Sequence, residues 1–215
     1  MSTEFVRRLP VYLVLDCSGS MSGEPIEAVR QGVKALLADL RGDPTALETA
    51  FLSVITFDSG ARQVTPLTEL MLFQEPTLDA SGSTSFGEAL KLLEQAIDKE
   101  ARKSTPTQKG DWRPLVFVMT DGQPTDTWQA AADSVKSKKL GNIICCAAGS
   151  GAATEPLKRV SETVVKLDNL QPDTLKQFFK WVSDSIKMTS QSMAQVAADA
   201  PVGLPPAPPQ IHMVP

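Results

Sequence analysis

Two continuous apolar runs in this chain each end close to an aspartate. Residues 11–15 lead directly into Asp16, and residues 115–119 lead through Thr120 into Asp121. Continuous runs of β-forming residues are typical of strands that are buried on both faces of a parallel sheet. Because parallel strands point the same way, we expect both aspartates at one edge of the sheet.

Helical patterns separate the strand-like runs. Apolar residues recur at helical spacing in four segments, 26–40, 86–97, 128–135 and 175–186. Further strands are predicted for residues 51–57, 143–148 and 164–167. Strands that alternate with helices form a mostly parallel sheet with right-handed crossovers. The sequence therefore predicts a doubly wound α/β fold with helices on both faces of the sheet.

One strand is expected to run against the others. Asp58-Ser59-Gly60 is typical of a tight turn, and it leads into a short strand-like segment around residues 62–65. Since a hairpin pairs its two strands antiparallel, we expect this segment at an edge of the sheet.

Composition limits the classes of function. The 215 residues are enough for one domain and an appendage, and 21 Lys and Arg against 25 Asp and Glu argue against a nucleic acid partner. Cys17, Cys145 and Cys146 form no CxxC pair, so neither a disulfide framework nor a zinc knuckle is indicated. The first apolar run is too short for a signal peptide or a membrane span, so we expect a cytoplasmic protein without a membrane partner.

The periodic pattern stops at Thr189. Six of the last fifteen residues are proline, and residues 189–215 are predicted to form an extended or disordered Pro-rich tail. The tail could dock on a partner, fold back onto the domain or remain free. His212, the only histidine, lies in this tail, so the predicted domain lacks the commonest general base.

Three loops at the predicted sheet edge carry oxygen side chains. Asp16, Ser18 and Ser20 alternate in the loop after the first strand, so an extended loop turns all three toward one point. Thr84 precedes the helix at 86–97, and Asp121 follows the strand at 115–119. These five residues are the predicted metal ligands.

The chemistry of the five side chains favours a hard cation. Mg2+ binds about six oxygens and gives up its water reluctantly, so two carboxylates and three hydroxyls suit it, with Mn2+ or Ca2+ as alternatives. Because only two of the five ligands are charged, such an ion would attract a further carboxylate. The predicted function is to bind an acidic side chain of a partner.

Neighbouring residues have simpler interpretations. Ser, Gly and Asp also occur in turns and helix caps that bind no ligand. Asp126, with Gln129 three positions later, is interpreted as the cap of the helix near Trp128. The alternatives are support of the metal site and contact with a basic residue of a partner. Cys17 is expected to point into the core and to be inert.

The motifs together resemble a known family. Asp16-x-Ser18-x-Ser20, Thr84 in Gly-Ser-Thr-Ser and Asp121 in Thr-Asp-Gly look like the metal-ion-dependent adhesion site (MIDAS) of von Willebrand factor A (VWA) domains, over residues 5–188. The resemblance implies a six-stranded sheet with one antiparallel edge strand. It also implies direct coordination by Ser18, Ser20 and Thr84, partly water-mediated contacts from Asp16 and Asp121, and a Glu or Asp of the partner at the sixth position.

A narrower resemblance concerns the biological setting. Val-Leu-Asp-Cys-Ser-Gly-Ser-Met-Ser-Gly-Glu-Pro-Ile, Met-Thr-Asp-Gly-Gln-Pro-Thr-Asp and the Pro-rich ending are similar to bacterial tellurium-resistance-associated, TerY-like proteins. This similarity implies a cytoplasmic stress-response complex with kinase-like or phosphatase-like partners, and no catalysis by this chain.

Two other functions compete with the binding module. A Mg2+-dependent phosphohydrolase would also use aspartates at strand ends, but the sequence has no Asp-x-Asp pair and no Gly-x4-Gly-Lys-Ser/Thr loop. A scaffold in which the metal only joins the loops is the third possibility.

Overall fold

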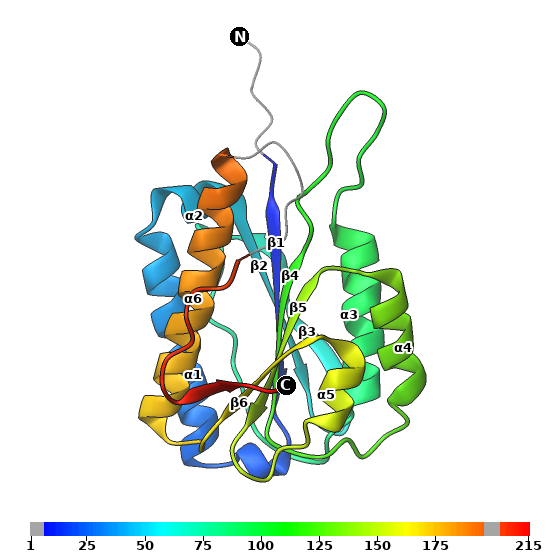
Figure 1. Ribbon diagram of the computed structural model, residues 1–215, viewed down its shortest axis with the longest axis vertical. Helices are drawn as coiled ribbons and strands as arrows, with labels where there is room; N and C mark the ends of the chain where they lie inside the picture. Colours follow the sequence, from blue (N-terminus) through cyan, green and yellow to red (C-terminus); the bar gives the residue numbers. More distant parts are fainter. Residues whose placement is uncertain (1–6, 196–202) are drawn as a thin grey trace.

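A seven-stranded sheet forms the centre of the computed structural model, which describes residues 7–195 and 203–215 (Figure 1). Its strands are β1 (Leu9–Asp16), β2 (Ala50–Phe57), β3 (Ala61–Glu69), β4 (Leu115–Thr120), β5 (Asn142–Ala148), β6 (Thr163–Leu167) and β7 (Ile211–Met213). They lie in the order β3-β2-β1-β4-β5-β6-β7. The chain therefore winds outward from β1 in one direction and then, from β4, in the other.

The pairing is mostly parallel. β1 pairs in parallel with both β2 and β4, and the parallel series continues through β5 to β6. β3 runs antiparallel to β2, as the turn at residues 58–60 predicts, and β7 runs antiparallel to β6 at the opposite edge. The expected count of six strands is wrong by one because β7 comes from the Pro-rich tail.

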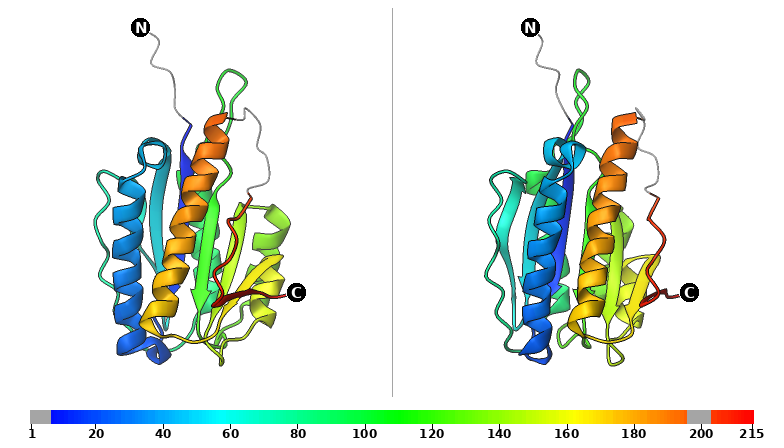
Figure 2. Two further views of the ribbon diagram at one scale, coloured as in Figure 1. Left: turned by 60° about the vertical axis from the view of Figure 1, so that its left-hand side comes forward. Right: turned by 90° about the vertical axis from the view of Figure 1, so that its left-hand side faces the viewer.

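Helices cover both faces of the sheet. They are α1 (Glu24–Arg41), α2 (Pro44–Thr49), α3 (Phe86–Glu100), α4 (Gln129–Lys138), α5 (Glu155–Val160) and α6 (Pro172–Gln195), with a short 3-10 turn, η1 (Gly19–Met21), after β1. Figure 1 places α1, α2 and α6 on one side of the sheet and α3, α4 and α5 on the other. α1 and α6 lie side by side across their face (Figure 2).

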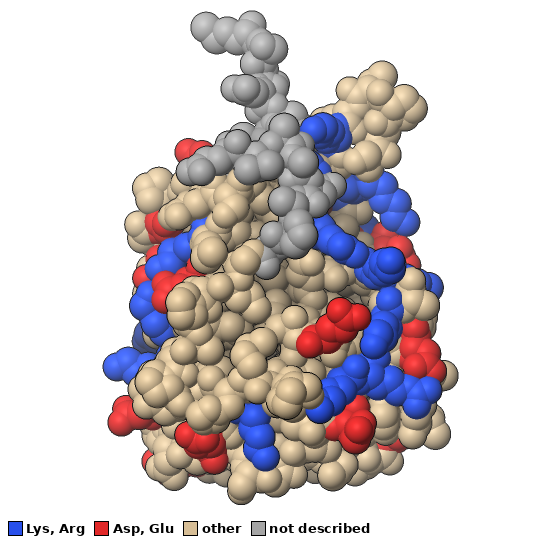
Figure 3. All heavy atoms as spheres, viewed as in Figure 1, with Lys and Arg blue, Asp and Glu red and all other residues tan. Residues whose placement is uncertain are grey.

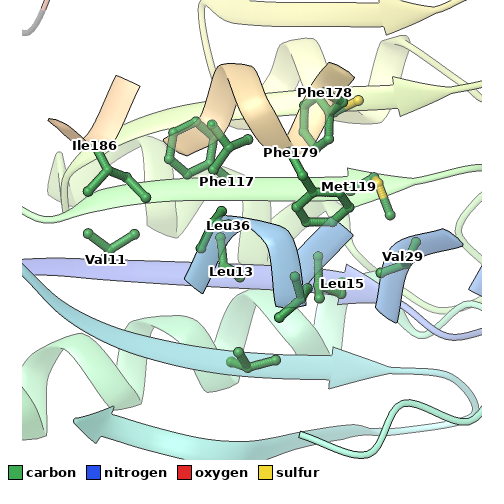
Figure 4. Close-up of a cluster of buried hydrophobic side chains, with 14 of the residues drawn as sticks. Val11, Leu13, Leu15, Val29, Leu36, Phe117, Met119, Phe178, Phe179 and Ile186 are labelled. Atoms are coloured by element: carbon green, nitrogen blue, oxygen red, sulfur yellow. The ribbon is translucent and has the colours of Figure 1, made fainter. Parts of the chain in front are cut away.

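Alternate side chains of the central strands belong to two separate hydrophobic cores, one on each face of the sheet. Leu13 and Leu15 of β1 and Phe117 of β4 pack under α1 and α6 (Figure 4), whereas Tyr12 and Val14 face α3 and α4. All eight residues of β1 are buried, as its continuous apolar run predicts. Within the described ranges, 7–195 and 203–215, no helix has the length and apolar character needed to span a bilayer.

The C-terminal part of the chain is more ordered than its composition predicts. α6 continues to Gln195, past the expected domain end at 188. Beyond the gap at 196–202, Leu204 packs on the core, and the Trp181 indole N–H donates to Pro205 O at 3.0 Å. Ile211 is buried in β7. The described tail residues therefore fold back onto the domain, which is one of the alternatives that the sequence leaves open, and residues 211–213 form a strand.

Candidate metal centre

The predicted ligands lie where the winding direction of the sheet reverses. Asp16 ends β1, Asp121 follows β4, and these two strands are neighbours in the sheet. Loops that leave such neighbouring strands in opposite directions open a crevice at their carboxyl ends. Ser18 and Ser20 lie in the loop after β1, and Thr84 lies just before α3.

Asp16 is held by two hydrogen bonds at the base of this crevice. Its Oδ1 accepts from the Ser18 backbone N–H at 2.8 Å, and its Oδ2 accepts from the Thr120 hydroxyl at 2.5 Å. The residue is fully buried. Burial raises the pKa of the Asp16 carboxyl, and the hydrogen bonds from Ser18 and Thr120 only partly offset this rise.

Three of the predicted ligands are in direct contact. Ser18 Oγ lies 3.1 Å from Ser20 Oγ, and the Ser20 hydroxyl donates to Asp121 Oδ1 at 2.7 Å. Burial raises the pKa of the Asp121 carboxyl as well, against the hydrogen bond from Ser20. The structure therefore joins the first and third predicted loops through a chain of oxygen atoms.

Thr84 approaches this chain from the second loop. Its Oγ1 would lie 3.5 Å from a Cβ placed on Gly122, the residue after Asp121. Backbone and side-chain hydrogen bonds to Thr125 fix its position: the Thr84 N–H donates to Thr125 Oγ1 at 3.1 Å, and the Thr125 N–H donates to Thr84 O at 2.9 Å. Thr84 thus lies beside Gly122, the residue after Asp121, and its hydrogen bonds go to Thr125 and not to the other four predicted ligands.

The loops are also tied to one another through the backbone. The Gly19 N–H donates to Gly82 O at 3.0 Å, and the Ser81 N–H donates to Cys17 O at 2.8 Å. Gly82 has a φ of +70°, a conformation that other residues rarely adopt. The loop that carries Thr84 is consequently fixed against the loop that carries Ser18 and Ser20.

Asp126 has a different role from the predicted one. Its carboxylate accepts from the backbone N–H groups of Gly87 and Glu88, each at 3.0 Å, in the first turn of α3. The cap position of α4 is Trp128, which makes no side-chain cap. The prediction that Asp126 caps the helix near Trp128 is therefore wrong. It secures the start of α3, directly after Thr84.

Three supporting residues were not singled out from the sequence. Thr120 orients Asp16, Thr125 holds Thr84, and Asp58 O accepts from the Ser85 N–H at 2.8 Å. The sequence does contain a signal for Thr120, because this hydroxyl residue ends a strand that is otherwise apolar. The other two depend on contacts between loops that are distant in the sequence.

The cysteines are buried, as expected for Cys17. Burial raises the pKa of the Cys17 thiol to about 12, and it raises the pKa of Cys145 and Cys146 as well. A thiol with a raised pKa is a poor nucleophile at neutral pH. The three cysteines pack as small apolar residues of the core.

The histidine is not in a free tail. His212 lies in β7, and its Nε2 is 2.8 Å from Asp168 Oδ1 at an exposed position. Two strands, β5 and β6, separate β7 from β4 and Asp121. The expectation that the folded part lacks a histidine is corrected, but this side chain belongs to the far edge of the sheet.

The residues at the crevice fit a hard cation. Among the described residues, no group of three or more His, Cys, Asp and Glu is arranged to hold a metal ion. The crevice instead combines two carboxylates with neutral hydroxyls, and oxygen-only donors suit Mg2+, Mn2+ or Ca2+. A cation between the loops would also offset the unfavourable burial of the two carboxylates.

Curated relatives share part of their length with this chain. An uncharacterized protein of Synechocystis sp. is 34% identical over 146 residues, which cover 64% of this chain and 30% of the relative. The Arabidopsis thaliana E3 ubiquitin-protein ligase WAVH1 is 30% identical over 148 residues, 59% of this chain and 20% of the ligase. The chain thus spans less than a third of either relative.

Solved structures have the same fold. A von Willebrand factor type A protein from Catenulispora acidiphila has a TM-score of 0.65 at 20% identity, covering 85% of this chain and 43% of that chain. Proximal thread matrix protein 1 from the mussel byssus, whose MIDAS motif is occupied by zinc, has a TM-score of 0.61 at 19% identity, covering 83% of this chain and 48% of that chain.

The family model of the von Willebrand factor type A domain matches residues 11–181. This range runs from the first buried strand into α6 and includes every element that forms the crevice. The chain therefore belongs to the von Willebrand factor type A domain family.

Proposed function

We propose that this domain binds a divalent cation through Asp16, Ser18, Ser20, Thr84 and Asp121 and uses it to bind an acidic side chain of a partner protein. The observation that carries the proposal is the chain of contacts from Ser18 to Ser20 to Asp121. These hydroxyl and carboxylate oxygens come from separate loops and meet in one crevice.

Mg2+ is the proposed ion. The bound cation would supply positive charge at the mouth of the crevice, where it would attract a carboxylate. Mn2+ and Ca2+ favour the same oxygen ligands, and the zinc in the MIDAS motif of the mussel protein supports occupancy by a divalent ion in this family. Ser18 and Ser20 would have to turn their hydroxyl hydrogens away from the ion to present lone pairs.

We also propose that the domain is not an enzyme. His212, the one histidine, lies in β7, which β5 and β6 separate from β4, and the thiols are buried. The alternatives are a Mg2+-dependent phosphohydrolase and a scaffold whose metal is purely structural. The Arabidopsis relative is an E3 ligase by name, but this chain covers 20% of it. We therefore do not propose ligase activity for this chain.

Calorimetry with Mg2+ and then with a glutamate-containing peptide tests the proposal. Wild-type protein is expected to bind Mg2+ and to bind the peptide only afterwards. S18A removes an oxygen ligand, and D121N replaces a negative carboxylate with a neutral amide, so both variants are expected to lose the two binding steps. S137A removes an exposed hydroxyl of α4 and serves as the matched control, with unchanged binding.

The possible outcomes separate the three functions. Peptide binding that persists in EDTA contradicts the metal-dependent module. Mg2+ binding without any Mg2+-dependent peptide affinity indicates the scaffold. Release of phosphate from p-nitrophenyl phosphate by wild type, with loss of this activity in D121N, indicates the phosphohydrolase.

The proposed setting is a cytoplasmic bacterial complex for tellurium or stress resistance, with kinase-like or phosphatase-like partners. Its support is the sequence around Asp16 and Asp121 together with the Pro-rich ending. Neither a nucleic acid nor a membrane partner is proposed. Co-purification of a kinase-like or phosphatase-like protein with wild type in Mg2+, but not in EDTA or with D121N, is the expected result.

A further inference from the structure

A cavity with an apolar floor opens at the opposite end of the sheet from the candidate metal centre. It lies at the amino ends of β4, β5 and β6, beside the end of α4. Its floor consists of Leu115, Val135, Ile144 and Val160, which are buried, with Leu140 and Ile143 half-buried around them. Leu204 of the tail lines one side.

Cations form the rim of this cavity. Arg113, Lys136 and Lys139 line it and are exposed, and among the described lining residues Glu162 is the one carboxylate. In the described part of the chain, none of these three cations forms a salt bridge, although nearby Lys138 pairs with Glu94. Figure 3 shows Lys and Arg side chains gathered on this side of the molecule, over α4. The chain as a whole carries a net charge of −4, whereas the rim of this cavity is positively charged.

Close contacts join the two segments that form part of the rim, residues 113–114 and 139–141. α4 ends at Lys138, and Lys139 adopts a left-handed conformation with a φ of 48°. The Arg113 guanidinium donates to Lys139 O at 3.0 Å. A Cβ on Gly141 would lie 2.4 Å from Pro114 O, so glycine permits this close approach of the two loops. These contacts therefore hold the segment that carries Lys139 against the segment that carries Arg113 at the edge of the cavity.

We infer that this cavity is a second docking site, which binds an acidic segment of a partner protein that carries an apolar side chain. The floor would bury the apolar side chain, and flanking carboxylates would meet Arg113, Lys136 and Lys139. A single-stranded nucleic acid fits less well, because the described residues that line the cavity include no aromatic side chain to stack on a base.

Fluorescence anisotropy with a labelled acidic peptide that contains a central leucine tests the inference. EDTA is kept in every sample so that the candidate metal centre cannot bind the peptide carboxylates. The double variant K136Q/K139Q is expected to weaken binding about tenfold or more, because two charged contacts are lost. K91Q/K99Q, which removes two exposed lysines of α3, is the control with the same change in net charge, and its binding is expected to equal that of wild type.

A second peptide, in which glycine replaces the leucine, tests the apolar floor and is expected to bind more weakly. Amide chemical-shift changes in labelled wild-type protein are expected at Gly141 and Asn142, which locates the peptide without any variant. Equal binding by both double variants, no saturable binding at millimolar peptide, or displacement of the peptide by a single-stranded oligonucleotide would overturn the inference.

Discussion

At the scale of single residues, the crevice depends on groups that do not themselves belong to the predicted ligand set. Asp16 is fully buried, and the Ser18 backbone N–H and the Thr120 hydroxyl donate hydrogen bonds to its carboxylate. Removing a donor from a buried carboxylate costs stability and leaves its orientation less defined. Thr120 is therefore a positioning residue for the proposed metal centre.

The variant T120V tests this role. It keeps the shape of the side chain but removes the hydroxyl, so we expect the unfolding free energy to fall by about 1–3 kcal/mol because the buried Asp16 loses a donor. We expect Mg2+ affinity to fall about tenfold or more, the usual effect of losing a group that orients a ligand. Urea denaturation and calorimetry measure the two effects.

T120S retains a hydroxyl and is expected to recover Mg2+ affinity, whereas T127V, at an exposed threonine, should change neither quantity. Loss of stability in T120V with unchanged Mg2+ affinity would mean that Thr120 is only structural.

At the scale of elements, the tail strand β7 is the main departure from expectation. It pairs with β6 over three residues, and Ile211 is 4% exposed whereas Met213 of the same strand is 56% exposed. The strand closes an edge of the sheet that would otherwise present unpaired backbone groups. Burial of Ile211 is the interaction that we expect to hold it there.

The pair I211A and M213A measures this contribution. I211A removes buried apolar volume and is expected to cost about 2 kcal/mol or more. M213A changes an exposed residue of the same strand and is expected to stay within about 0.5 kcal/mol of wild type. Equal values for the two variants in urea denaturation would indicate that β7 does not stabilise the domain.

At the scale of the whole molecule, the two proposed sites lie at opposite ends of one sheet. The candidate metal centre is at the carboxyl ends of β1 and β4, and the cationic cavity is at the amino ends of β4, β5 and β6. Strands of six to eight residues separate them by roughly 20 Å. A domain of this kind could hold two acidic partner segments at once.

Metal binding should stabilise the whole domain. An ion that binds only the folded state adds about 2.7 kcal/mol when its concentration is 100 times its dissociation constant. Since about 1 kcal/mol corresponds to roughly 2–4 °C in a domain of this size, saturating Mg2+ is expected to raise Tm by about 5–10 °C. EDTA should reverse the rise, and D121N should lack it. An equal rise in D121N would contradict binding at this crevice.

The layered architecture and the identity of the candidate ligands follow from local patterns in the sequence. Residues 11–15 and 115–119 are apolar without interruption because both faces of their strands are buried, and this property is local. The position of Asp16 and Asp121 at strand ends follows from the same pattern. Short elements were missed, since α2 and α5 have six residues each and are too short to give a helical period.

The contacts between distant segments are visible in the three-dimensional fold alone. Asp126 lies five residues after Asp121 in the sequence, yet it secures the start of α3, and the Pro-rich tail supplies a seventh strand. The cationic rim joins Arg113 to Lys136 and Lys139 from a different segment. Such contacts depend on the distances between loops in space. Local periodicity carries no information about those distances, because it reports only which side of its own element each residue faces.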